Sequence, residues 1–147
     1  MEQMLASSAD AATILKLYEL RTETLMRQAR AWVGGEFWPQ SAADYFAIAN
    51  NPADPHNAWL RQVISYWEMA AAMVLHGAVS APLFFDCNGE GFYIMAKFAP
   101  FLDEIRTQSP SFMAKTQALV DRFPEAATRY ESVRRTLAKN RSALKNN

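Results

Sequence analysis

One segment has the residue types and spacing with which a calcium-binding EF-hand loop begins: Asp86-Cys87-Asn88-Gly89-Glu90-Gly91. Such a loop places oxygen ligands at its first, third and fifth positions and a glycine at its sixth. Its twelfth position should hold a bidentate glutamate, but here it is Lys97, whose positive charge would repel the ion. We therefore interpret the segment as a loop that connects two helices.

Cys87 is the second residue with reactive chemistry, because a thiolate becomes a nucleophile when a neighbouring histidine activates it. The chain has two histidines, His56 and His76, which lie about 30 Å apart if one helix carries both. A single cysteine beside Phe84 and Phe85 is typical of a small buried side chain. One cysteine and two distant histidines are also too few ligands for zinc. We expect no catalytic residue, no metal site and no cofactor.

A third candidate is a polar stripe of Arg61, Ser65, Glu68 and His76 along the helix predicted at residues 54–77. Their spacing places all four on one helical face. The stripe either lines a polar pocket between helices or faces solvent, with Glu68 in a structural ion pair with Arg106. We favour the second interpretation, because partly buried carboxylates are normally paired.

The helix that carries the polar stripe is apolar at most of its other positions. Asp54 is suited to cap its start, Pro55 fits its first turn, and Gly77 is suited to end it. A helix of this kind must be surrounded by other helices in water. The sequence therefore predicts an all-α, single-domain bundle spanning residues 1–147, with about six or seven helices around this central one.

Capping and turn residues delimit the remaining helices. Pro100 is expected to break one of them, because proline cannot continue a helix interior. No internal repeat and no alternating strand pattern of useful length is present. The predicted ranges are 10–33, 41–49, 80–85, 92–107, 109–123 and 124 onward.

Charge and cysteine content exclude several classes of function. Fifteen basic residues balance fifteen acidic ones, which removes any overall electrostatic case for nucleic acid or an anionic membrane. Residues 129–147 are predicted as a basic, solvated C-terminal helix that frays. The single cysteine, the lack of a basic region at residues 1–3 and the lack of a long apolar run predict a cytoplasmic protein without a transmembrane segment.

A longer pattern joins several of these segments. It consists of Trp67-Glu68, Val74-Leu75-His76-Gly77-Ala78-Val79-Ser80, Leu83-Phe84, Asp86, Phe98, Pro100-Phe101 and Ile105-Arg106. With this pattern the chain resembles, over about residues 59–123, a family of short bacterial helical proteins known only as a domain of unknown function. Two positions depart from that family: Ile105 and Arg106 adjoin, and Phe98 stands where tryptophan is more usual. The resemblance implies a helical fold and no particular activity.

The large apolar residues suggest two functions. Four Trp, nine Phe, five Tyr and seven Met favour a non-enzymatic helical module that self-associates or docks a protein partner. Its candidate interface comprises Tyr18, Leu25 and Trp32, which fall seven residues apart, and the loop residues Phe37 and Trp38. The alternative is a bundle that binds a small apolar ligand or lipid in a pocket walled by Trp67, Met73, Phe84, Phe85 and Phe92. We favour the first, because core packing is the simpler explanation for the second set.

Overall fold

The long helix α4 (Pro55–Leu75) packs against α2, α3, α6 and α8, so it is the central element, as predicted. The computed structural model describes residues 5–146. The expectations on residues 1–3 and on the end of the last helix at Asn147 therefore lie outside the described residues. Asp54 accepts a hydrogen bond from the His56 amide at 2.8 Å, and Gly77 takes a left-handed φ of 74° after the helix. These local signals define both ends of α4.

The all-α class is confirmed, since the described residues form nine α-helices and no strand. Seven helical ranges were predicted, and two of them are each divided into two α-helices. The elements are α1 (Ser8–Arg21), α2 (Thr24–Ala31), the π-helical turn η1 (Trp32–Glu36), α3 (Ala42–Ala49), α4, α5 (Ala81–Cys87), α6 (Glu90–Lys97), the 3₁₀ turn η2 (Ala99–Phe101), α7 (Leu102–Gln108), α8 (Ala114–Arg122) and α9 (Pro124–Lys145).

The first predicted helix, 10–33, breaks at Thr22. The Thr22 hydroxyl donates to the Glu19 carbonyl at 2.8 Å, and the Glu23 carboxylate accepts from the Met26 amide at 3.3 Å, which caps α2. The expectation of one continuous helix is therefore wrong, because side chains satisfy the backbone at the break and allow the chain to turn. Tyr18 and Leu25 consequently lie on two different helices.

The break expected at Pro100 is confirmed, since η2 separates α6 from α7. The helix predicted at 109–123 begins later, at Ala114, after a turn in which Met113 has a left-handed φ of 50°. The Ser109 carbonyl accepts a hydrogen bond from the Phe112 amide at 3.0 Å. Ser109 therefore begins this turn and does not cap the helix. The first turn of α8 is instead capped by a side chain from α4.

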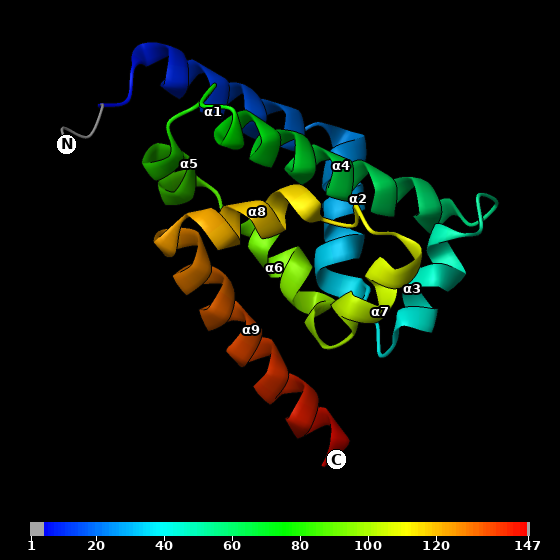
Figure 1. Cartoon of the computed structure of the whole chain (residues 1–147). Coiled ribbons are helices and arrows are strands. Elements are labelled where there is room, and N and C mark those ends of the chain that lie inside the picture. The colour runs from blue at the N-terminus through cyan, green and yellow to red at the C-terminus, as the bar shows by residue number, and fades with distance from the viewer. Residues whose placement is uncertain (1–4, 147) are drawn as a thin grey trace.

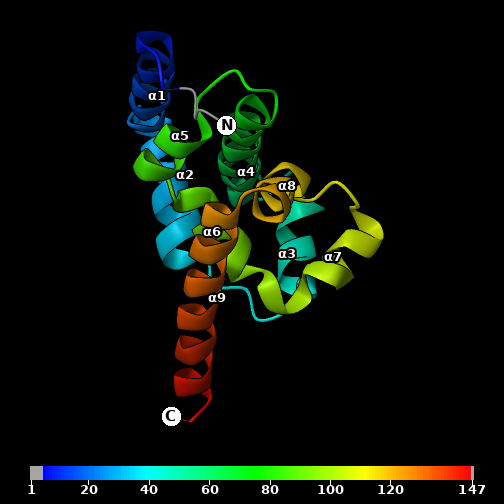
Figure 2. The same ribbon diagram turned by 60° about the vertical axis from the view of Figure 1, so that its left-hand side comes forward.

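Within residues 5–146, buried apolar side chains from all nine α-helices form a hydrophobic core cluster. The Tyr66 hydroxyl of α4 donates to the Leu17 carbonyl of α1, and α6 and α8 pack beneath α4 (Figure 1). Helix α9 packs along α6 and α8, and only its C-terminal end extends beyond the other helices (Figure 2). The outer face of α4 stays uncovered between α1 and α8, and it carries most of the polar stripe.

Candidate functional site

The loop that resembles a calcium site uses its polar groups inside the fold. The Asn88 side-chain oxygen accepts from Arg21 at 3.2 Å, and the Glu90 carboxylate accepts from Arg30 at 2.7 Å and from the Trp67 indole at 3.0 Å. These bonds connect α1, α2 and α4 to the start of α6. Within residues 5–146, no three His, Cys, Asp or Glu side chains come together so as to hold a metal ion.

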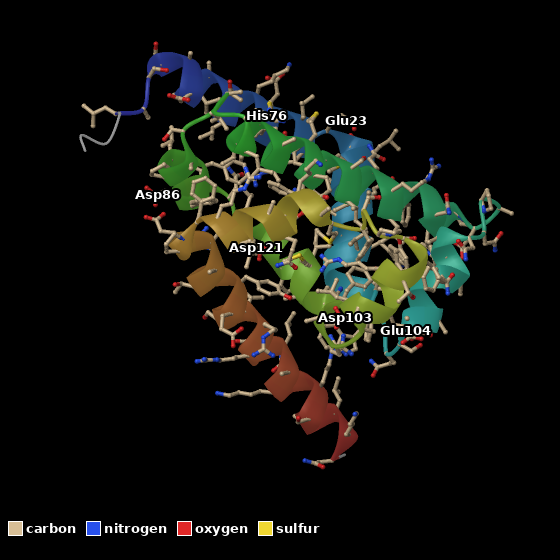
Figure 3. All side chains as sticks on the ribbon, in the orientation of Figure 1. Glu23, His76, Asp86, Asp103, Glu104 and Asp121 are labelled. Carbon is tan, nitrogen blue, oxygen red and sulfur yellow. The ribbon has the colours of Figure 1, made fainter. Side chains whose placement is uncertain are left out.

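Among the described residues, Cys87, His56 and His76 make no hydrogen bond to one another, and the Nδ1 atom of His56 instead lies 3.0 Å from the Asp54 carboxylate. Cys87 is exposed, His56 stacks on Trp32 with ring centroids 4.2 Å apart, and His76 is exposed at the end of α4. Figure 3 shows the labelled residues distributed over several elements and pointing to no common centre, with Asp103 and Glu104 together on α7. The labelled residues are Glu23, His76, Asp86, Asp103, Glu104 and Asp121.

Three members of the polar stripe lie in an open groove. The groove has a volume of about 580 Å³ and is bounded by α3, α4 and the start of α8; we call it the α3–α4–α8 groove. Arg61, Ser65 and Glu68 line it, whereas His76 does not. Its remaining walls are mainly apolar, with Leu60 and Ile64 from α4 among them. The polar stripe therefore faces solvent in part and lines a groove in part.

Glu68 caps helix α8 and does not pair with Arg106, which corrects the expected ion pair. Its carboxylate accepts from the amides of Lys115 at 2.9 Å and Thr116 at 2.8 Å, and from the Thr116 hydroxyl at 2.7 Å. The amides at a helix start lack partners within the helix and attract negative charge. Arg106 instead donates to the Phe112 carbonyl at 3.0 Å and to Gln117 at 3.1 Å. Both side chains thus hold the turn that forms one wall of the groove.

The candidate interface residues divide into two groups. Tyr18 and Leu25 are exposed, at 56% and 58%. Trp32 and Phe37 are buried in the core and stack with centroids 4.7 Å apart. Trp38 is half-buried, and the Arg141 guanidinium lies 4.3 Å from its ring centroid. Trp32, Phe37 and Trp38 therefore pack mainly against other residues of the same chain.

A second open groove, of about 530 Å³, separates α1 from α4. Leu20, Met26, Tyr66 and Met69 line it, and Leu20 and Met69 are 43% and 46% exposed. We call it the α1–α4 groove. The sequence placed Met69 among the apolar positions of the central helix but gave no sign that it faces outward, because the helix reads as apolar on nearly every side.

The apolar ligand pocket that the sequence suggested inside the bundle is nearly filled by side chains. Trp67, Phe84 and Phe92 enclose a cavity of only about 10 Å³. That volume corresponds to about one water molecule and is too small for an apolar ligand. These aromatic residues act as core packing.

Lys97 is a buried cation, whereas the sequence pattern indicated only that it occupies the twelfth position of the calcium-like loop. It is 1% exposed, and its Nζ donates to the carbonyls of Val33 at 2.6 Å and Gly34 at 3.4 Å, in η1. Burial lowers the pKa of Lys97 to about 8, and the positive charge of Arg141 contributes in the same direction. The amine sits beside η1, a type of turn often found at functional positions.

The chain was also compared with known proteins. The model of one family, described as Domain of unknown function (DUF4760), matches residues 6–123. The chain belongs to this family. No curated protein matches it. No solved structure matches it.

The DUF4760 match covers α1 to α8 and both grooves, whereas α9 follows it. Arg141 of α9 connects the two parts by donating to the carbonyls of Pro39 at 2.8 Å and Lys97 at 2.6 Å. None of the helices within the described residues has both the length and the apolar character needed to cross a bilayer.

Proposed function

We propose that this DUF4760 chain is a non-catalytic helical module that self-associates through the outward surface of α1, α2 and α4. Seven large apolar side chains are exposed within residues 5–146, and five of them lie on these three helices. The remaining two, Leu5 and Leu144, lie near the ends of the chain. The five are Leu15, Tyr18, Leu20, Leu25 and Met69, which we call the apolar surface.

The exposure of five large apolar side chains on three neighbouring helices carries the proposal. Single exposed apolar side chains are ordinary on any protein, whereas two that border one groove are typical of an association surface. Leu20 and Met69 border the α1–α4 groove, which gives an opposing side chain a place to insert. Apolar surface that a contact removes from water stabilises that contact by about 25 cal/mol per Å². Burial of this surface therefore favours association.

The charges near the apolar surface favour a second copy of the chain as the partner. Four exposed charged residues lie on α1, on α2 and at the N-cap of α2, and their formal charges sum to zero. They are Lys16, Glu19, Glu23 and Arg27. A surface with no net charge neither repels an identical surface nor selects a partner of one sign. Symmetric dimers are also the commonest assemblies of soluble proteins.

The test compares the mass in solution of the wild type with that of three variants, each of which replaces one apolar residue with aspartate. Tyr18→Asp and Leu25→Asp place a carboxylate on the apolar surface, where association would bury it without a partner. We expect each to weaken dimerisation by about tenfold or more, because an unpaired buried charge is costly. Leu144→Asp is the matched control, since Leu144 is 61% exposed on α9, and it should leave the dimer intact. An unchanged dimer in both test variants would refute this placement of the interface.

A further inference from the structure

The side chain of Arg61 uses one of its five N–H donors in a hydrogen bond within the described residues. Its Nε donates to the Asn57 side-chain oxygen at 3.0 Å. Asn57 is buried, and its amide nitrogen donates in turn to the carbonyls of Ile48 at 2.8 Å and Ala49 at 3.1 Å, where α3 ends. Among the described residues, the terminal nitrogens of Arg61 have no hydrogen-bond acceptor and no ion-pair partner. The structure thus orients a guanidinium by a buried amide and leaves its outer edge free.

The groove next to Arg61 is apolar along its floor. Leu60 and Ile64 of α4 line it together with Tyr45 of α3. Pockets of several hundred Å³ with apolar walls and a few fixed polar groups are typical of sites for small molecules. The groove of about 580 Å³ therefore has room for an apolar chain that starts at Arg61.

The charges in the groove favour an anion. Lys115 is an exposed second cation in its lining. The carboxylate in the lining, Glu68, is already engaged by two amides and a hydroxyl at the start of α8, which compensate its negative charge. A guanidinium binds a carboxylate through two parallel hydrogen bonds more strongly than it binds a neutral group.

We propose that the α3–α4–α8 groove binds a small amphiphilic carboxylate of the fatty-acid class, with its carboxylate on the terminal nitrogens of Arg61 and its chain along Leu60 and Ile64. This site is separate from the apolar surface proposed for self-association, although Ser65 lines both grooves. It differs from the filled cavity at Trp67 because it is open to solvent and has a fixed charged group at one side.

The experiment titrates the full chain with decanoate, below the concentration at which decanoate forms micelles, and follows binding by calorimetry and by amide and methyl NMR shifts. We expect saturable binding of one decanoate per chain, with the largest shifts at Ile64 and Ser65. Decanol has the same chain without the charge, and it should bind at least about tenfold more weakly.

Three variants test the role of Arg61. Arg61→Gln should weaken decanoate binding by about tenfold or more, since it removes a charge-assisted pair of hydrogen bonds. Arg61→Lys keeps the positive charge but lacks the parallel N–H donors of a guanidinium. Its affinity for decanoate should therefore fall between those of the wild type and Arg61→Gln. Arg122→Gln removes an exposed charge at the end of α8, outside the groove lining, as the matched control and should leave binding unchanged. Equal binding of decanoate and decanol, unchanged affinity in Arg61→Gln, or shifts confined to other elements would each overturn the proposal.

Discussion

Replacing Lys97 with methionine should remove a rise in stability with pH that the wild-type protein shows. Burial holds the pKa of Lys97 at about 8 in the folded chain, against 10.5 for an ordinary lysine. In the unfolded chain the amine regains the ordinary pKa. Between the two values the unfolded chain binds a proton that the folded chain has lost, so the free energy of unfolding increases with pH. This stabilisation is complete above the unfolded pKa and is lost as the pH falls through the folded one.

The size of the effect follows from the two pKa values. From about pH 7 to about pH 9.5, a lysine whose pKa falls from 10.5 to about 8 on folding raises the free energy of unfolding by about 2 kcal/mol. Methionine has a similar length and no titratable group, so Lys97→Met lacks this rise.

The assay is urea unfolding followed by tryptophan fluorescence at several pH values. Burial raises the pKa of Tyr66 to about 12, which lowers stability at high pH in both proteins. The difference between wild type and Lys97→Met cancels that contribution. We expect the difference to shift by about 2 kcal/mol in favour of the wild type between about pH 7 and about pH 9.5. Lys139→Met, at an exposed position of α9, is the control and should show no such shift. A difference that stays constant with pH would mean that folding does not lower the pKa of Lys97.

Two further predictions concern the contacts that hold the ends of α8 and α9. Glu68→Ala removes the acceptor of the Lys115 and Thr116 amides, so the free energy of unfolding should fall by about 1–2 kcal/mol in urea titrations; an unchanged midpoint and slope would show that Glu68 does not cap α8. Arg141→Ala removes the hydrogen bonds to Pro39 and Lys97, so amide hydrogen exchange should accelerate in residues 138–146 but not in α1. Equal exchange in wild type and variant would mean that Arg141 does not anchor α9.

The elements that the sequence predicted well are those whose limits are set by nearby residues. Asp54, Pro55 and Gly77 act within a few positions of the ends of α4, and Pro100 acts at its own position. The break at Thr22 was missed because it has neither glycine nor proline. Its local signals are Thr22, whose hydroxyl donates to the Glu19 carbonyl, and Glu23, which caps α2 through an amide three residues on.

The candidate sites were less predictable because distant residues create them. Glu68 caps a helix that begins 46 residues later in the sequence, as the positions of Glu68 and Ala114 show. A helical pattern does not reveal such a contact. The orientation of Arg61 is a partial exception, since Asn57 lies one helical turn before it and both residue types are visible in the sequence. Only the fold shows that Asn57 is anchored by α3.

We propose that the apolar surface of α1, α2 and α4 joins two copies of the chain. Light scattering coupled to size-exclusion chromatography measures the mass in solution, with the wild type and Leu25→Asp compared at matched concentrations. We predict twice the chain mass of 16.6 kDa for the wild type and a shift toward a single chain for Leu25→Asp. A wild type that stays at 16.6 kDa across the accessible concentration range would contradict the claim.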